Sequence, residues 1–162
     1  MKGSTVHEHE TDVPASDLWA IYGTLRAAEL TVELLPHILA KFEVISGDGG
    51  VGTILHLTFP LVSIPGLESY KEFTKVDNEN YVKEATVIDG DLLKLGFLFY
   101  MIRIEVIAKG PGSSVVRTTV EYEIDDAHPE LEAVARAAPF GVIAVKLSEH
   151  AKEKKVITQA AS

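Results

Sequence analysis

A lysine on a predicted strand is the residue best placed to do chemistry. Lys83 falls in the segment 81–88, and one face of that strand carries Tyr81, Lys83, Ala85 and Val87. This is the more apolar face, so side-chain alternation directs the lysine inward. Removal from water lowers the pKa of an ammonium, which can then exchange protons with a carbonyl or an amine. The alternative interpretation is a solvated strand lysine, because the opposite face is only slightly more polar.

Two further groups could act with this lysine. Tyr70 and Glu72 are two residues apart on the predicted strand 69–76, which puts them on one side of it. A phenol and a carboxylate near Lys83 would form a proton-transfer cluster. An ordinary amphipathic strand accounts for the same spacing, so the pattern alone leaves both interpretations open.

Other chemical motifs receive little support. The glycine-rich segment 48–52 lacks the Lys-Ser/Thr of a phosphate-binding loop and precedes a strand, which favours a tight strand connection or part of a cavity rim. The six histidines have no metal-ligand spacing, and no Gly-x-Ser-x-Gly elbow is present. The chain has no cysteine, which excludes a disulfide framework, a thiolate metal site and a cysteine nucleophile.

Length and charge limit the classes of protein. The 162 residues are 46% apolar, which predicts one domain spanning 1–162. A net charge of −9 argues against nucleic acid or an anionic membrane as a partner. No apolar run follows Lys2 and no segment approaches about 20 apolar residues, so we expect no signal peptide, no membrane span and a cytoplasmic location.

The elements that must position these residues form an α+β pattern. Two short helices, the first capped by Ser16 and the second ending near Pro36, interrupt a series of strands with short connections. A turn is expected at 89–91 and a loop at 60–66. The C-terminal stretch 131–147 has helical periodicity, with Pro139 and Gly141 expected to kink it. The predicted strands are 4–11, 42–46, 53–59, 69–76, 81–88, 95–108 and 113–124.

Antiparallel meanders with an apolar-striped helix predict a helix-grip fold. In it, a curved seven-stranded antiparallel sheet surrounds a long C-terminal helix and two short helices, enclosing an apolar cavity for a small organic ligand. Arg103 and Glu105 mark the outer face of strand 95–108, so its other face points inward. The predicted cavity lining is Leu55, Leu57, Phe59, Phe73, Leu98, Tyr100 and Ile102.

Several motifs in one order resemble a known family. They are the segment 47–55, Tyr70-Lys71-Glu72, the turn 76–79, Leu95-Gly96 and Tyr100-Met101. Together they resemble the norcoclaurine-synthase-like branch of the pathogenesis-related class-ten proteins, which have the birch-pollen-allergen fold. The resemblance runs from about Val6 to the C-terminal helix.

The resemblance implies roles for the three candidate residues. Lys83 occupies the place of the essential lysine, and Tyr70 and Glu72 match the family's tyrosine and glutamate. The chain has one residue fewer between the tyrosine motif and Val76, a difference that a bulge would absorb.

A second departure concerns the reaction. Where ring-closing enzymes of this family have an aspartate after the Tyr-Met pair, this chain has Ile102, and Leu92 replaces their pocket tyrosine. The resemblance therefore implies imine formation without assisted cyclisation, as in the norbelladine synthases of amaryllis-type alkaloid pathways. That implies condensation of tyramine with 3,4-dihydroxybenzaldehyde to the imine norcraugsodine.

In that reaction Lys83 would be the general acid. Glu72 would accept the proton of the amine or keep Lys83 charged, and Tyr70 would hydrogen-bond a substrate oxygen. No cofactor is expected. The chain lacks a dinucleotide fingerprint, so later reduction to norbelladine is assigned to a partner reductase that uses NADPH.

Two other functions are compatible with the sequence. Many relatives in the wider superfamily only carry hydrophobic ligands, in which case Lys83 would have no kinetic role. A Pictet–Spengler enzyme with a different base is the other possibility. The oligomeric state is not encoded in any pattern.

Overall fold

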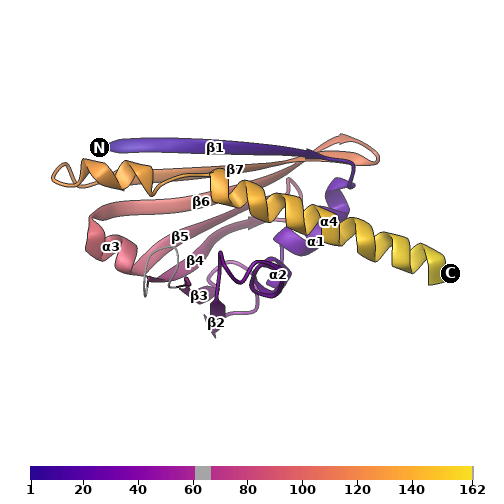
Figure 1. Ribbon diagram of the computed structural model, residues 1–162, viewed down its shortest axis with the longest axis horizontal. Coiled ribbons are helices and arrows are strands. Elements are labelled where there is room, and N and C mark those ends of the chain that lie inside the picture. Colours follow the sequence, from indigo (N-terminus) through magenta and orange to yellow (C-terminus); the bar gives the residue numbers. More distant parts are fainter. Residues whose placement is uncertain (61–66, 162) are drawn as a thin grey trace.

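The architecture is one curved antiparallel sheet with a long helix on its concave side (Figure 1). The computed structural model describes residues 1–60 and 67–161, with side chains up to residue 154; the predicted loop 60–66 lies outside it except for Pro60. The strands are in the order β1-β7-β6-β5-β4-β3-β2. Their bounds are β1 Lys2–Thr11, β2 Lys41–Ser46, β3 Ile54–Thr58, β4 Glu68–Asp77, β5 Val82–Gly90, β6 Phe97–Gly110 and β7 Ser113–Ile124.

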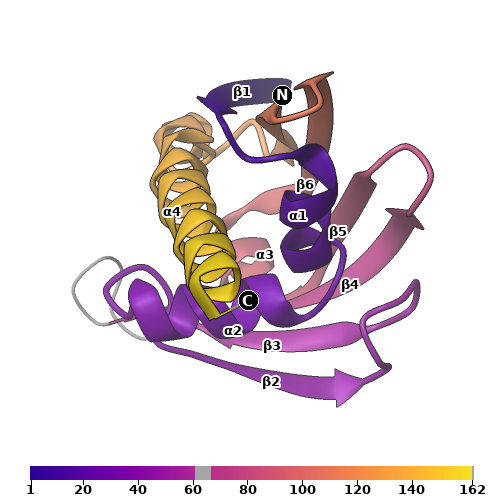
Figure 2. The same ribbon diagram turned by 90° about the vertical axis from the view of Figure 1, so that its right-hand side faces the viewer.

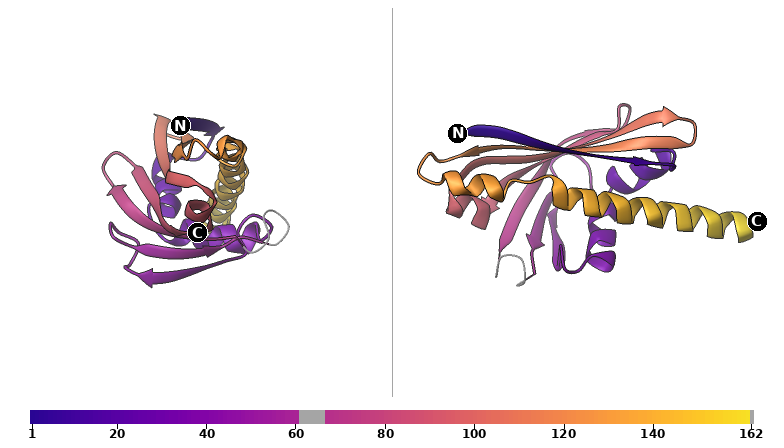
Figure 3. Two further views of the ribbon diagram at one scale, coloured as in Figure 1. Left: turned by 90° about the vertical axis from the view of Figure 1, so that its left-hand side faces the viewer. Right: turned by 45° about the horizontal axis from the view of Figure 1, so that its top comes forward.

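The helices occupy the inner side and one end of this sheet. They are α1 Ala15–Tyr22, α2 Arg26–Leu34, α3 Asp91–Leu95, the 3-10 helix η1 Pro129–Ala133 and α4 Ala138–Ala161. Figure 2 shows the sheet curling around α4 from β1 to β2. Figure 3 shows α4 continuing from η1 along the length of the molecule. The predicted helix-grip arrangement of seven strands and a C-terminal helix is confirmed.

A tryptophan joins α1 to the β4–β5 turn. Trp19 Nε1 donates a 2.9 Å hydrogen bond to Asn78 Oδ1, and its ring stacks on Tyr81 at 5.3 Å between centroids. Asp77 Oδ1 accepts the backbone N–H groups of Glu79 and Asn80, as expected of an aspartate that begins a turn. The Val-Asp-Asn-Glu motif therefore builds a turn that fixes the position of α1.

Three expectations about the helices are wrong. Ser16 does not cap α1, because the helix begins at Ala15 with Pro14 in the N-cap position. The segment after Gly90 forms α3, where only a turn was predicted. The C-terminal stretch is divided into η1 and α4, so Pro139 is the second residue of α4 and does not kink it. Proline has no N–H to donate, and the first turn of a helix needs none there. Gly141 lies against β1, where an added Cβ would clash with the ring of His7.

The buried apolar residues form three clusters. The first lies between α1, α4 and β7 and includes Leu18 and Leu147. The second lies between α3, β6, β7 and η1 and includes Phe97 and Ile124. The third lies between α2, β3 and β4 and includes Leu55. No helix within the described part of the chain combines the length and apolarity needed to cross a bilayer.

Candidate active site

Lys83 points to the inner side of the sheet. Its side chain is 7% exposed. Nζ donates hydrogen bonds to the backbone oxygens of Tyr22 at 3.0 Å and Thr24 at 3.4 Å, and it lies 4.0 Å from the centroid of the Phe73 ring. Removal from water lowers the pKa of Lys83 from 10.5 to about 8. The group is therefore anchored, and its pKa is close to neutral pH.

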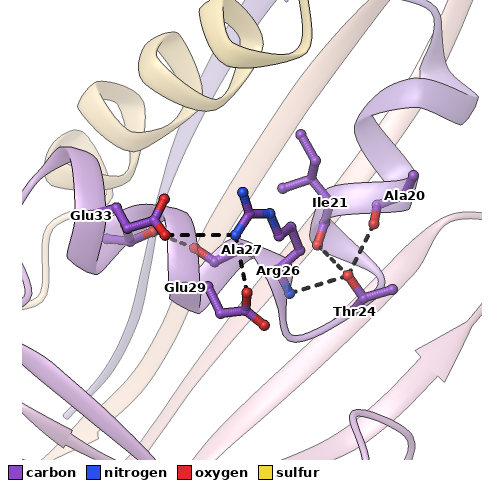
Figure 4. Close-up of polar contacts among 8 residues, drawn as sticks. Ala20, Ile21, Thr24, Arg26, Ala27, Glu29 and Glu33 are labelled. Carbon is purple, nitrogen blue, oxygen red and sulfur yellow. Dashed lines mark hydrogen bonds and ion pairs between the residues drawn. The ribbon is translucent and has the colours of Figure 1, made fainter. Parts of the chain in front are cut away.

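Of the two carbonyls that anchor Lys83, that of Tyr22 ends α1 and that of Thr24 lies in the turn between α1 and α2. Figure 4 shows the polar contacts of Thr24 and Arg26 around this turn. Thr24 fixes this turn, since its hydroxyl lies 3.0 Å from the carbonyl oxygen of Ala20 and 3.1 Å from that of Ile21. The same hydroxyl accepts the backbone N–H of Arg26 at 3.2 Å, and the guanidinium of Arg26 pairs with two glutamates of α2. Local polar contacts thus hold the acceptors of Lys83 in place.

Tyr70 and Glu72 do not lie with Lys83. The inward direction expected for them is wrong, because the buried residues of β4 are Ser69, Lys71 and Phe73, which alternate with them. Tyr70 stacks on the ring of His56 at 4.5 Å on the outer side of the sheet.

A bulge in β4 explains this reversal. Phe73 pairs with Ala85 and Lys75 with Glu84, so Thr74 is the extra residue. Val76, which pairs with Lys83, packs against the same interior as Phe73 although the two are three residues apart. Counting back from Val76 by twos would have placed Glu72 and Tyr70 inside, and the bulge moves both to the outer face.

The residue that occupies the expected place of Glu72 is Lys71. Its side chain is 8% exposed, and Nζ lies 6.0 Å from the ring centroids of both Phe59 and Tyr100. Removal from water lowers its pKa to about 8 as well. Sequence reasoning missed this residue, although Lys71 alternates in phase with Phe73, which had been assigned to the lining.

Most of the predicted lining is on the inner face. Leu98 is the exception, being 61% exposed, because a register shift between Phe97 and Phe99 interrupts the alternation and turns Phe97 inward. The remaining predicted lining residues are buried or, for the first of them, partly buried: Phe59, Leu55, Leu57, Phe73, Tyr100 and Ile102.

Ile102 lies among apolar neighbours. It is 6% exposed and pairs with Ala85 on β5 and Val120 on β7. Leu92 is buried in α3 and belongs, like Ile102, to the second cluster. These two positions therefore contribute apolar surface and no proton-transfer group.

The interior of the sheet is cationic. Among side chains in the described residues, Lys71 and Lys83 are the buried ones of the types that are charged near neutral pH, and both are cationic. The described part of the chain has no group of three or more histidine or acidic side chains that could hold a metal. Desolvation without acidic partners lowers both lysine pKa values, and this arrangement suits proton transfer or attack on a carbonyl.

Known proteins match this chain in sequence over nearly its whole length. Norbelladine synthase of Narcissus pseudonarcissus is 49% identical over 156 residues, covering 96% of this chain and 95% of that protein. S-norcoclaurine synthase of Thalictrum flavum subsp. glaucum is 36% identical over 151 residues, covering 92% of this chain and 70% of that protein.

The solved structures agree with these sequence relationships. A point mutant of the Thalictrum norcoclaurine synthase in complex with a transition-state analogue superposes with a TM-score of 0.85 at 34% identity, over 96% of this chain and 97% of that one. The same enzyme in complex with dopamine and hydroxybenzaldehyde gives a TM-score of 0.83 at 34% identity, over 94% and 88% of the two chains. Residues 1–159 match the model of a family described as "Pathogenesis-related protein Bet v 1 family". The chain therefore belongs to the Bet v 1 family, with norcoclaurine synthases among its structural neighbours.

Proposed function

We propose that this protein condenses tyramine with 3,4-dihydroxybenzaldehyde to an imine and water in alkaloid biosynthesis. Support comes from the 49% identity to a norbelladine synthase and from the fold shared with a norcoclaurine synthase in complex with dopamine and hydroxybenzaldehyde. Both relatives, by their names, belong to alkaloid-forming enzymes.

The observation that carries the proposal is the buried ammonium of Lys83. In the proposed reaction this group protonates the aldehyde oxygen and then the departing hydroxyl of the carbinolamine. Its pKa of about 8 suits this work, because a general acid is most effective when its pKa lies near the working pH. Its anchoring by the α1–α2 turn holds the donor in one position.

The concave face offers an apolar environment for the two substrates. We place both aromatic rings between the sheet and α4, against side chains such as Leu55, Phe73 and Tyr100. Holding the two reactants together removes much of the entropic cost of a bimolecular reaction. Ile102 gives no base for ring closure, so the reaction stops at the imine.

Reduction of the imine is the task of a different protein in this scheme. We propose a partner reductase that draws its hydride from NADPH, while this chain works without a cofactor. An imine hydrolyses readily in water, so efficient capture requires the reductase to be present during the reaction.

The test compares the rate of imine formation with and without protein, using a reductase to trap the product. Lys83→Ala should lose most of the protein-dependent rate, and Lys75→Ala, which removes an exposed lysine of β4, should retain it. Equal rates for the two variants would remove Lys83 from the mechanism. Binding of both aromatics without any acceleration over background would identify a carrier instead.

A further inference from the structure

The second buried lysine sits where two apolar clusters meet. Phe59 contacts both the second and the third cluster, and Tyr100 belongs to the second. Lys71 Nζ lies 6.0 Å from each of these two rings. An amine in this position can approach a planar aromatic ligand held against the rings.

The two buried lysines differ in their bonding. Lys83 donates to two carbonyl oxygens, contacts that stabilise its charged form. For Lys71, the described residues provide two aromatic rings and no carbonyl, carboxylate or hydroxyl within hydrogen-bonding distance of Nζ. The environment thus favours an acid at Lys83 and a neutral amine at Lys71.

On the same inner face, a neighbouring hydroxyl group has no hydrogen-bond partner among the described residues. Ser69 is two residues before Lys71 on β4 and is fully buried. Within the described structure, its Oγ makes no hydrogen bond. Buried polar atoms are usually paired, so the unpaired hydroxyl of Ser69 on this inner face points to a polar ligand that satisfies it.

We propose that Lys71 is the nucleophile that captures the aldehyde substrate as a Schiff base, an inference that rests on the proposed function. Desolvation of a lysine in apolar surroundings is an established way to obtain a neutral, nucleophilic amine at moderate pH. The aldehyde ring lies against Phe59 and Tyr100, and the oxygen of the carbinolamine lies within reach of the Ser69 hydroxyl. Lys83 supplies the proton that this oxygen needs in order to leave.

The chemical steps balance without an oxidant or reductant. Neutral Nζ of Lys71 adds to the carbonyl carbon, and the resulting hydroxyl leaves as water with a proton from Lys83. The nitrogen of tyramine then adds to the same carbon, and the bond to Lys71 breaks. The product iminium loses a proton that restores Lys83, so one aldehyde and one amine give one imine and one water.

Reductive trapping tests the covalent step without the amine. The protein is incubated with 3,4-dihydroxybenzaldehyde and sodium cyanoborohydride, which reduces a Schiff base to a stable secondary amine, and peptides are mapped by mass spectrometry. We expect one dihydroxybenzyl group on Lys71 and none on Lys75, the exposed lysine of the same strand. Label on Lys83, or label spread over exposed lysines, would overturn the assignment.

Lys71→Arg separates a nucleophile from a simple positive charge. Arginine keeps the charge and forms no Schiff base under these conditions, so the adduct should vanish and the amine-dependent rate should fall roughly tenfold or more. An unchanged rate in this variant would show that Lys71 only attracts an acidic group of the ligand, and the proposal would be wrong. Circular dichroism of the variant checks that it is folded.

The two proposals fail in different ways. If the wild-type protein forms the Lys71 adduct but tyramine does not discharge it, the capture step stands and the condensation is overturned. If the wild-type protein accelerates imine formation and no adduct is trapped, the condensation stands and the Schiff base is overturned.

Discussion

At the scale of single residues, the notable feature is a buried cation that has no counter-charge among the described residues. Lys71 is inside the sheet with aromatic neighbours, and burial alone accounts for its low pKa. Such a group opposes folding, because an ammonium loses its hydration on burial. A residue that lowers the free energy of unfolding and is buried on the inner face of the sheet is well explained by a role in binding or catalysis.

Replacing Lys71 by Met should therefore stabilise the protein at pH 7. The pKa falls from 10.5 to about 8, and at about 1.4 kcal/mol per unit the free energy of unfolding should rise by no more than about 3 to 4 kcal/mol. Unfolding in guanidinium chloride measures this gain: the midpoint should move to a higher denaturant concentration while the slope m of the free energy against denaturant stays the same. Lys83→Met should raise the free energy of unfolding by less, because it leaves two carbonyl oxygens without their hydrogen-bond donor. Destabilisation by Lys71→Met would contradict the finding that Nζ has no hydrogen-bond partner within residues 1–60 and 67–154.

The lowered pKa of Lys71 also predicts how the free energy of unfolding depends on pH. Between pH 8 and 10.5 the unfolded lysine is protonated and the folded one is not, so the unfolded state binds more protons and stability rises with pH. Below pH 8 both states are protonated, and this contribution no longer varies with pH. Unfolding curves at pH 7.5, 9 and 10 should show the rise in wild type, with a smaller rise in Lys71→Met.

Position 102 should control whether a ring can close. Ile102→Asp places a carboxyl among apolar groups, where burial raises its pKa and costs about 2 to 4 kcal/mol of stability. With dopamine and 4-hydroxyphenylacetaldehyde, this variant should form a chiral tetrahydroisoquinoline that wild type forms poorly. Ile102→Asn is the control, because asparagine has the shape of aspartate but cannot act as a base. Equal product from both variants would assign no role to a carboxylate there.

Site residues were predictable only where strand alternation is regular. Lys83 and Ile102 lie on uninterrupted stretches, and their inward direction followed from the pattern. Tyr70 and Glu72 were misplaced because one inserted residue, Thr74, reverses every side chain beyond it. The sequence hint of a bulge was that this chain has one residue fewer than the family between the Tyr-Lys-Glu motif and Val76. That difference in spacing does not tell which of the two paired strands bulges.

At the scale of elements, the site depends on how α1 meets the β4–β5 turn. The turn between α1 and α2 supplies the acceptors of Lys83, and Trp19 ties α1 to Asn78. An amide side chain at the tip of one hairpin thereby supports a helix that lies far away in the sequence. The Val-Asp-Asn-Glu motif, which in the sequence served only as a mark of the family, therefore has a structural role in positioning α1.

Asn78→Ala should weaken that connection. Loss of the acceptor leaves the indole N–H of Trp19 without a partner, which should cost about 1 kcal/mol of stability. Thermal unfolding followed by tryptophan fluorescence reports on both stability and the environment of Trp19. Glu79→Ala, at an exposed position of the same turn, should change stability by no more than about 0.5 kcal/mol. Equal effects of the two substitutions would argue that the hydrogen bond is unimportant.

Elements were predictable where periodicity was long. Strand 113–124 has the predicted bounds, and the other strands begin one or two residues from the predicted position and end within two residues of it. The five-residue helix α3 was missed because it is too short for a helical period to appear. The break before α4 was missed because apolar residues of η1 continue the helical spacing although the backbone does not.

At the scale of the whole molecule, charge is distributed unevenly between surface and interior. The net charge is −9, whereas the buried acidic or basic side chains of the described residues that can be charged near neutral pH are two lysines. A protonated amine is attracted by the acidic exterior but repelled by the interior ammonium groups. Tyramine should therefore react as the neutral amine, and the aldehyde should bind before it.

This distribution leads to a prediction for the pH dependence of the reaction. Capture of the aldehyde needs Lys71 neutral, so the rate should rise as pH approaches about 8; loss of the water needs Lys83 protonated, so the rate should fall above about 8. The phenol of Tyr100, whose pKa burial raises to about 12, stays neutral throughout. A plot of kcat/KM for the aldehyde, at saturating tyramine, should be bell-shaped, and its two limbs describe the lysine pair jointly. Lys71→Arg should abolish the rising limb and leave the falling one, whereas a rise preserved in that variant would assign the titrating base to another group.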